Sequence, residues 1–186
     1  IGLSIGTRTD CVTDDILDYL YEKSKEQEIW IEYGIQSFFQ TTLDKINRAD
    51  DVENMRYWIR RTKEKGLNVC GHLIYGLPDE NQEMMLETFK QTIDLKVDSI
   101  KFHPLYVVKN TLLTNEFKKG RFNPISEELY IDTVVQSIIN LPQNVSVQRV
   151  TAGIDDDTLL SPLWCKNKHQ QMKKIRVALE EKGFIY

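Results

Sequence analysis

The chain has 186 residues, of which 41% are hydrophobic and 28% charged, and its formal net charge is -4. This composition is ordinary for a globular chain with one substantial core, and no segment looks long and apolar enough to span a membrane. Three scattered cysteines argue against a disulfide framework and, with no visible signal peptide, favour the cytoplasm. The acidic balance excludes a basic footprint over the whole domain.

Strand-like and helix-like segments alternate along the chain, in the order typical of a parallel α/β fold. The expected strands cover residues 1–6, 29–35, 67–75, 99–105 and 145–150. The expected helices cover residues 14–26, 51–65, 80–95, 127–140 and 166–182. Apolar residues within these helices recur at the three-and-four spacing of one buried face.

The segment 71–78 (GHLIYGLP) joins the third strand to the following helix through a glycine-proline turn. Asp79 can cap that helix, with Gln82 three residues on in capping-box spacing. Helix starts of this kind offer unpaired N–H groups, and Gly76 would let the backbone approach a flat ligand. The junction therefore predicts a ligand site, although a bare turn also explains it.

Alternate residues of each expected strand separate into an apolar and a polar set, which point to opposite faces of the sheet. The polar set consists of Glu32, Gln36, His72, Lys101 and His103. A parallel sheet with helices on both faces would be apolar throughout, so only one face is expected to be covered, as in a barrel or part of one. Polar side chains near strand ends inside a barrel indicate a site. The alternative is a hydrogen-bonded core network without a ligand.

Several segments together resemble the radical S-adenosylmethionine (radical SAM) enzymes, on the branch of oxygen-independent coproporphyrinogen oxidase and the Elongator catalytic subunit, and within it the YhcC-like group. The segments are IGTRTD (5–10), EYGIQS (32–37), INR (46–48), 71–78, KFHPL (101–105) and PLWCKNK (162–168). They occur in the family's order and cover most of the chain.

The resemblance implies an α/β fold, a partial (βα) barrel of the radical-SAM type truncated at its N-terminal strands. Residues 1–142 would be the C-terminal part of the barrel, and 143–186 a strand and helix extension packed on it. Such barrels hold S-adenosylmethionine against a 4Fe-4S cluster at the strand C-terminal ends. The family's Cys-x-x-x-Cys-x-x-Cys loop is absent, since Cys11, Cys70 and Cys165 lie far apart. The cluster ligands are therefore expected in a missing N-terminal part, with no metal ligand in this chain.

The resemblance also implies roles for particular residues. Gln36 would bond the ribose, and Arg48 would pair with the methionyl carboxylate, which a planar guanidinium holds through two hydrogen bonds. His72 stands where coproporphyrinogen oxidase has an aspartate on the ribose. Ile74 would pack on adenine and Gly76 would leave room for the base. The remaining residues expected around the cofactor are Glu32, Thr7, Arg8, His103 and Leu105.

Simpler structural roles are open for two of these residues. Arg48 could be a solvated residue in the loop before helix 51–65, where Asp50 and Glu53 offer local capping. His103 could be a strand-end histidine bonded to a backbone carbonyl. In both cases the side chain would have no ligand.

The intact enzyme would reductively cleave S-adenosylmethionine, with an electron donor such as flavodoxin or ferredoxin, and abstract hydrogen from an unknown substrate. This part alone is expected to be inactive, and its unpaired first strand to favour self-association. The alternatives are a metabolite-binding barrel, a scaffold without catalysis, and a tRNA-modifying radical SAM enzyme. No Gly-x-Gly-x-x-Gly or Walker loop supports the first.

Two basic clusters bear on nucleic-acid binding. Lys118, Lys119 and Arg121 form one, and Lys166, Lys168, Lys173, Lys174 and Arg176 form the other. A solvated helix face balanced by Glu180 and Glu181 is the favoured interpretation of the second cluster. Nucleic acid remains a partner that the sequence permits without favouring, and no membrane is expected.

Overall fold

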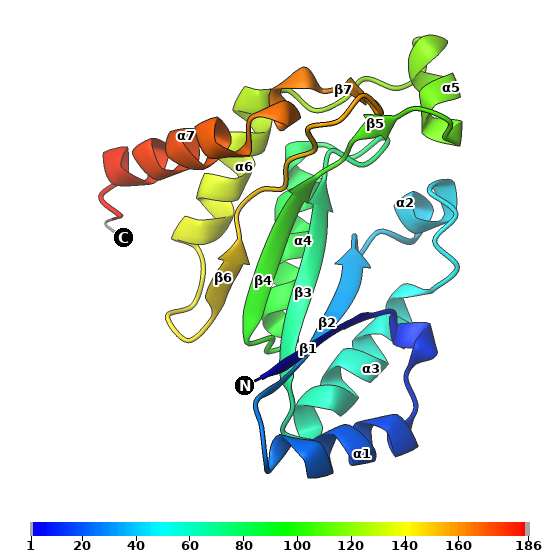
Figure 1. Ribbon diagram of the computed structural model, residues 1–186, viewed down its shortest axis with the longest axis vertical. Helices are drawn as coiled ribbons and strands as arrows, with labels where there is room; N and C mark the ends of the chain where they lie inside the picture. Colours follow the sequence, from blue (N-terminus) through cyan, green and yellow to red (C-terminus); the bar gives the residue numbers. More distant parts are fainter. Residues whose placement is uncertain (1, 185–186) are drawn as a thin grey trace. The chain divides into compact units, whose positions relative to one another are not determined.

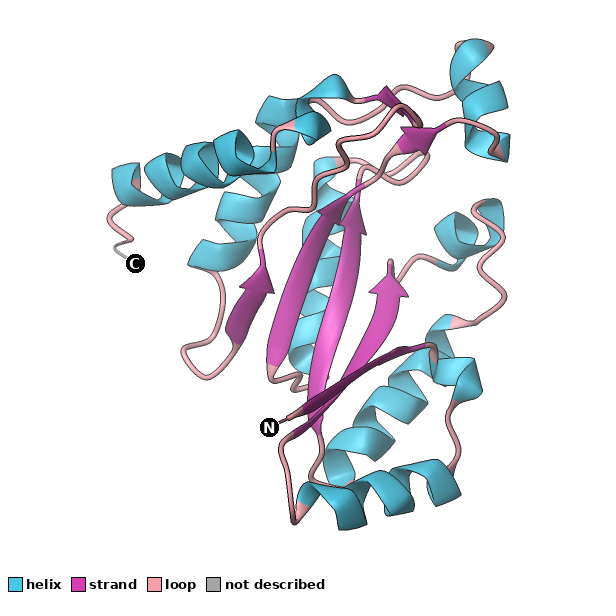
Figure 2. Cartoon of the chain, viewed as in Figure 1, coloured by secondary structure: helices cyan, strands magenta, loops and turns pink. Residues whose placement is uncertain are grey.

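The structure is a computed structural model that describes residues 2–184, and its strands and helices alternate along the chain (Figures 1 and 2). The strands are β1 (Leu3–Thr7), β2 (Ile29–Gln36), β3 (Asn68–Tyr75), β4 (Ser99–Pro104), β5 (Val107–Val108), β6 (Ser146–Arg149) and β7 (Leu159–Ser161). The helices are α1 (Asp14–Ser24), α2 (Gln40–Lys45), α3 (Val52–Glu64), α4 (Gln82–Asp94), α5 (Leu112–Lys118), α6 (Glu127–Ile139) and α7 (Lys168–Glu181). Two 3-10 turns are η1 (Thr9–Cys11) and η2 (Leu163–Lys166). No helix within residues 2–184 has the length and apolar character needed to cross a bilayer.

The main sheet has five strands in the order β1-β2-β3-β4-β6, and β5 and β7 form a separate antiparallel pair. Strand β2 pairs in parallel with both β1 and β3. Parallel neighbours need crossover connections, and helices α1 and α3 provide them here. The predicted parallel α/β fold is confirmed.

The predicted elements of the main sheet and its long helices are all present, with ends that differ by a few residues. Residue 1 lies outside the described residues. The prediction that Asp79 caps the helix after β3 is wrong, because Asp79 has a left-handed backbone with φ of 66°. Asn81 caps α4 instead, since its side-chain oxygen accepts a hydrogen bond from the Met84 N–H at 2.9 Å.

The residues fall into two compact units. The first contains the described residues up to Leu73, with Glu87–Lys101 and Pro142–Gln148. The second contains Ile74–Leu86, Phe102–Leu141 and the described residues from Arg149 onward. The division at 142/143 into barrel and extension stays a prediction.

The core of the first unit is built on the apolar face of β2, where Ile29, Ile31, Tyr33 and Ile35 are buried. The Tyr33 hydroxyl shares a 2.8 Å hydrogen bond with Thr62 of α3, and burial raises the pKa of Tyr33 to about 12. Helix α4 also packs closely on this face. A β-carbon at Gly71 of β3 would lie 2.9 Å from the Thr92 methyl group. Glycine is therefore required at 71 for that helix to approach the strand.

Aromatic residues dominate the core of the second unit. The rings of Tyr75 and Phe102 are 5.4 Å apart, and the Tyr75 hydroxyl shares a 2.8 Å hydrogen bond with Ser137 of α6. Tyr130, also on α6, donates to the Val150 carbonyl at 2.9 Å and packs against Trp164. These buried hydroxyls all have partners, as a close-packed core requires.

Candidate functional site

A charged network on the half-exposed face of the first unit joins four neighbouring strands. Glu32 of β2 accepts hydrogen bonds from His72 Nε2 of β3 at 2.7 Å and from Lys101 Nζ of β4 at 2.5 Å. Ser4 of β1 donates to the other oxygen of the same carboxylate. A carboxylate only accepts, so His72 carries its proton on Nε2 in this arrangement. The prediction that Glu32, His72 and Lys101 share one face is confirmed.

The electrostatics of Glu32 follow from this network. Burial alone would raise its pKa, but the hydrogen bonds from Lys101, Ser4 and His72 outweigh burial and lower the pKa to about 2. The Glu32 and Lys101 side chains are each only 13% exposed. The carboxylate is therefore held charged at neutral pH beside an ammonium group that offsets its charge.

Gln36 occupies the end of β2 in a backbone conformation unusual for a side chain other than glycine. Its φ is 68°, and the register between β2 and β3 shifts between Gly34 and Gln36. This is a β-bulge, which re-aims the strand end. Residues held in such conformations cluster at functional sites, because the fold has to overcome their strain.

Arg48 lies in the loop between α2 and α3 and reaches back to β2. Its Nη2 donates to the Gly34 carbonyl at 2.7 Å, while its Nε is buried and has no hydrogen-bond partner. A β-carbon at Gly34 would lie 3.5 Å from Nη2, an ordinary contact distance, so the guanidinium lies directly against the strand. Burial and the neighbouring Arg8 lower the pKa of Arg48. The arginine is therefore a half-buried cation whose Nε donor has no protein partner, and not the solvated loop residue of the alternative interpretation.

Arg8 braces the loop that carries Arg48. Its guanidinium holds Asp10 through both carboxylate oxygens and donates to the Ala49 carbonyl at 2.8 Å. Thr9 donates to Asp50 of the same loop. Thr7 lies beside Arg8, with its hydroxyl 3.4 Å from the Arg8 carbonyl. In this structure Arg8 fixes the backbone next to Arg48.

The other predicted residues belong to the second unit. His103 Nδ1 donates to the Pro104 carbonyl at 2.7 Å, and its ring lies 4.7 Å from that of Tyr106. This carbonyl bond is the simpler role considered from the sequence, and it holds the ring in place. The Leu105 N–H donates to the backbone carbonyl of Tyr75 at 2.9 Å. Ile74 is half-buried and precedes the buried Tyr75.

Gly76 has φ of 89°, and its N–H points at the Met85 sulfur, 3.2 Å away. The expected reason for this glycine, room for a base, stays a prediction. A β-carbon at Gly76 would lie 2.7 Å from Cγ2 of Ile125, so the glycine makes room for that side chain. Its left-handed backbone is the second reason that only glycine suits the position.

Sequence reasoning missed three participants. Lys101 was placed on the polar face but not among the site residues, although its alternation with Phe102 was a usable signal. Alternation with Leu3 and Ile5 put Ser4 on the polar side of its strand, but its contact with Glu32 depends on the β1–β2 register. Tyr106 has a buried hydroxyl without a hydrogen-bond partner, and burial raises its pKa.

An iron-sulfur cluster does not fit the side chains of the described residues. No three His, Cys, Asp or Glu side chains come close enough to hold a metal ion within residues 2–184. Cys11 is exposed, while Cys70 and Cys165 are buried, and burial raises the pKa of Cys165 to about 12. A buried thiol of this kind is a poor metal ligand, because ligation needs the thiolate.

These features define an α/β protein that presents charged and hydrogen-bonding groups along one face of its main sheet. A family model for the Radical SAM superfamily matches residues 2–92, and one for the radical SAM C-terminal domain matches residues 97–181. The chain belongs to the radical SAM superfamily, on its YhcC-like branch.

The curated relatives are similar to this chain over nearly its whole length. Protein YhcC of Escherichia coli K12 is 39% identical over 184 residues, which cover 98% of this chain and 60% of YhcC. YtqA of Bacillus subtilis is 34% identical, covering 98% of this chain and 57% of YtqA. The chain thus spans about 60% of the length of these relatives.

A solved structure has the same fold. The archaeal Methanocaldococcus infernus Elp3, with an N-terminal deletion, superimposes with a TM-score of 0.87 at 25% identity. That match covers 100% of this chain and 43% of the archaeal chain. The radical-SAM type of α/β fold is therefore confirmed.

Proposed function

We propose that this chain is the part of a radical SAM enzyme that holds S-adenosylmethionine at the strand ends of the first unit. The observation that carries the proposal is Arg48, whose Nε is a buried donor without a partner next to the Gly34 carbonyl. A buried, unpaired donor on a cation costs free energy unless a ligand satisfies it. A carboxylate is the ligand that a guanidinium fits best, and S-adenosylmethionine carries one.

The neighbouring residues would divide the rest of the cofactor between them. Gln36 would hydrogen-bond the ribose from its bulged position at the end of β2. Glu32 and His72, fixed by Lys101 and Ser4, would present a rigid polar wall to the cofactor or the substrate. The roles of Thr7 and Arg8 would be to position the Arg48 loop. Ile74, Gly76, His103 and Leu105 remain proposed contacts of the second unit.

S-adenosylmethionine bound beside a reduced 4Fe-4S cluster supplies hydrogen-abstracting chemistry. The side chains of residues 2–184 bring together no ligand set for such a cluster. The chain's own task would be to bind the cofactor, orient it and exclude competing reactions. The intact enzyme would draw its electron from a small carrier protein such as flavodoxin or ferredoxin, and this part alone would be inactive.

The test is the affinity of the intact protein for S-adenosylmethionine, measured by isothermal titration calorimetry without oxygen. We expect Arg48→Ala to weaken binding about tenfold to a hundredfold, the loss of a hydrogen-bonded charge pair. Arg48→Lys keeps the charge but loses the planar pair of guanidinium donors, so its affinity should lie between those of the parent and Arg48→Ala. Arg60→Ala, on the exposed side of α3, removes the same charge and should bind like the parent. Equal affinities for Arg48→Ala and the parent would refute the proposal.

A structured RNA is the substrate class we propose for the intact enzyme. The support is a relative from Methanocaldococcus infernus, named a tRNA uridine(34) acetyltransferase, that is 25% identical over 198 residues. This similarity favours RNA over a small-molecule substrate only if the chain has a basic surface that can bind a polyanion.

A further inference from the structure

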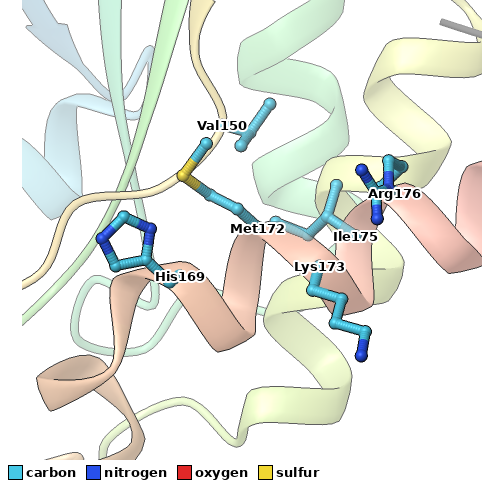
Figure 3. Close-up of a pocket in the computed structure, with 6 residues that line it drawn as sticks. All are labelled: Val150, His169, Met172, Lys173, Ile175 and Arg176. Atoms are coloured by element: carbon cyan, nitrogen blue, oxygen red, sulfur yellow. The ribbon is translucent and has the colours of Figure 1, made fainter.

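Helix α7 borders a groove whose titratable lining groups are all basic. The cavity has a volume of about 370 Å³ and is lined by Val150, His169, Met172, Lys173, Ile175 and Arg176 (Figure 3). Residues 169, 172, 173 and 176 form one stripe of the helix, because three- and four-residue steps return to the same face. In Figure 3, Met172 lies between His169 and Arg176 and points toward Val150.

The groove that α6 and α7 form on another side of α7 has a different charge balance. Its charged lining groups are Glu127, Glu128, Asp132, Lys174, Glu181 and Lys182. Lys174 pairs there with Glu127 at 2.6 Å. The acidic groups that α6 brings to α7 are thus gathered in that groove, and none lines the basic one.

Segment 166–176 holds five lysines and arginines and no acidic residue, in a chain with net charge -4. Within the described residues, Lys166, Lys168 and Lys173 make no ion pair. Arg176 reaches Glu180 only at 3.7 Å, with both side chains more than half exposed. Exposed pairs of this kind contribute little to stability, so Glu180 holds Arg176 only loosely and leaves it available to a ligand. The interpretation of this helix as a balanced solvated face therefore applies to the α6 side and not to the stripe at His169, Lys173 and Arg176.

The floor of the basic groove is apolar. Ile175 is buried, and Met172 is 43% exposed although it is a large apolar side chain. Single-stranded nucleic acid combines these two chemistries, since its phosphates need cations and its bases need apolar or aromatic surfaces. An acidic polypeptide would use the cations but has less use for the exposed methionine, whose thioether adapts to flat partners.

We infer that the α7 groove binds a single-stranded stretch of RNA, with Lys173 and Arg176 on phosphates and Met172 under a base. This inference rests on the proposed RNA substrate, and it names the surface of the second unit that would hold that substrate. The groove residues would bind the substrate, whereas Gln36 and Arg48 of the first unit would serve the cofactor alone.

The experiment measures fluorescence anisotropy of labelled oligouridine and of unfractionated transfer RNA with the intact protein, over a series of salt concentrations. We expect Lys173→Gln with Arg176→Gln to weaken binding at low salt by about tenfold or more and to lower the log-log salt slope by about two, because each lost phosphate contact releases about one fewer counterion. Met172→Ala should weaken oligouridine binding while leaving the salt slope unchanged.

The matched control is Lys174→Gln with Lys182→Gln, which removes the same charge from the other groove, at one residue of α7 and one directly after it. We expect this control to bind RNA like the parent. An equal loss in both double variants would overturn the groove assignment, as would an absence of RNA binding by the parent. Competition by oligoglutamate as strong as that by oligouridine would also overturn it, in favour of an acidic protein partner.

S-adenosylmethionine affinity, measured on the same variants, separates this inference from the proposed function. We expect the Lys173→Gln, Arg176→Gln variant to keep the parent's affinity for the cofactor and Arg48→Ala to keep the parent's affinity for RNA. Loss of RNA binding in Arg48→Ala would place the RNA at the cofactor residues and overturn the groove assignment.

Discussion

Glu32 is the residue on which the polar face of the first unit depends. It accepts hydrogen bonds from three strands, and two of its partners are Lys101 and His72. Because Lys101 is only 13% exposed, the loss of Glu32 would leave a nearly buried cation without its counter-charge. Removing one partner of such a pair usually costs more than the pair contributes, since the other charge stays buried.

We expect Glu32→Gln to destabilise the fold in a way that depends on pH. The folded-state pKa of Glu32 is about 2 against an ordinary 4.5, so its stabilisation is fully present above pH 4.5 and is lost as pH falls towards 2. The whole contribution is on the order of 3 kcal/mol. Urea unfolding at pH 7 and at several values below pH 4.5 measures this effect. The difference in free energy of unfolding between the parent and Glu32→Gln should become smaller as the pH falls.

Glu22→Gln is the control for that series. Glu22 pairs with Lys25 on exposed α1, where both side chains are more than half exposed. The same charge change should alter stability by less than about 1 kcal/mol, as exposed pairs do. A gap between parent and Glu32→Gln that stays constant from pH 7 to pH 2 would contradict the assigned pKa.

At the scale of the element, the end of β2 positions Gln36, one of the proposed cofactor residues. The bulge between Gly34 and Gln36 turns the strand end, and it gives Gln36 a left-handed backbone. A side chain in that conformation costs about 1–2 kcal/mol, which glycine would avoid. The chain has glutamine and not glycine at this position despite that cost, which supports a role for the side chain in binding.

We expect Gln36→Gly to stabilise the fold and to weaken the binding of S-adenosylmethionine. The relieved strain, reduced by the extra entropy of glycine in the unfolded chain, leaves a gain of about 0.5–1 kcal/mol in the free energy of unfolding. The lost hydrogen bond should lower S-adenosylmethionine affinity about tenfold. Urea unfolding and calorimetric titration of the same sample measure the two effects.

Lys96→Gly is the matched control, because Lys96 also has a positive φ of 61° and is exposed in the loop before β4. It should gain similar stability and leave the affinity unchanged. A Gln36→Gly variant with the affinity of the parent would remove Gln36 from the proposed cofactor contacts.

The long amphipathic elements could be predicted from the sequence because their periodicity is strong. Helix α3, for example, buries Met55, Ile59 and Thr62 on one face, and the prediction differed from it by one residue at each end. Short elements carry no such signal. Helix α2 has six residues, and β5 and β7 have two and three. Their positions follow from tertiary contacts.

The site was predictable to the extent that it depends on strand alternation. Parity alone placed Glu32 and His72 on one face, and their hydrogen bond confirms it. The left-handed backbone of Gln36 could not be predicted, because glutamine rarely adopts it and no local pattern marks the bulge. The packing of Ile125 over Gly76 joins residues far apart in sequence, so only the fold could reveal it.

At the scale of the whole molecule, the sheet order leaves β1 with a single neighbour among the described residues. Its residues are mostly exposed, and Leu3 is 43% exposed. An apolar cavity of about 390 Å³, lined in part by Ile5, Ile16 and Tyr19, lies beside it. An exposed strand edge next to apolar surface is a template for pairing with another chain.

We expect the 186-residue chain to self-associate through β1 in a concentration-dependent way. Leu3→Lys should shift light-scattering masses toward the monomer, because a charge on an edge strand opposes pairing with a second copy. Leu163→Lys makes the same change at a residue that is 64% exposed on η2, and it should associate like the parent. If the parent stays monomeric at every concentration, or if both variants lower the mass equally, the β1 edge is not the contact, and the apolar cavity beside it would not contribute to assembly.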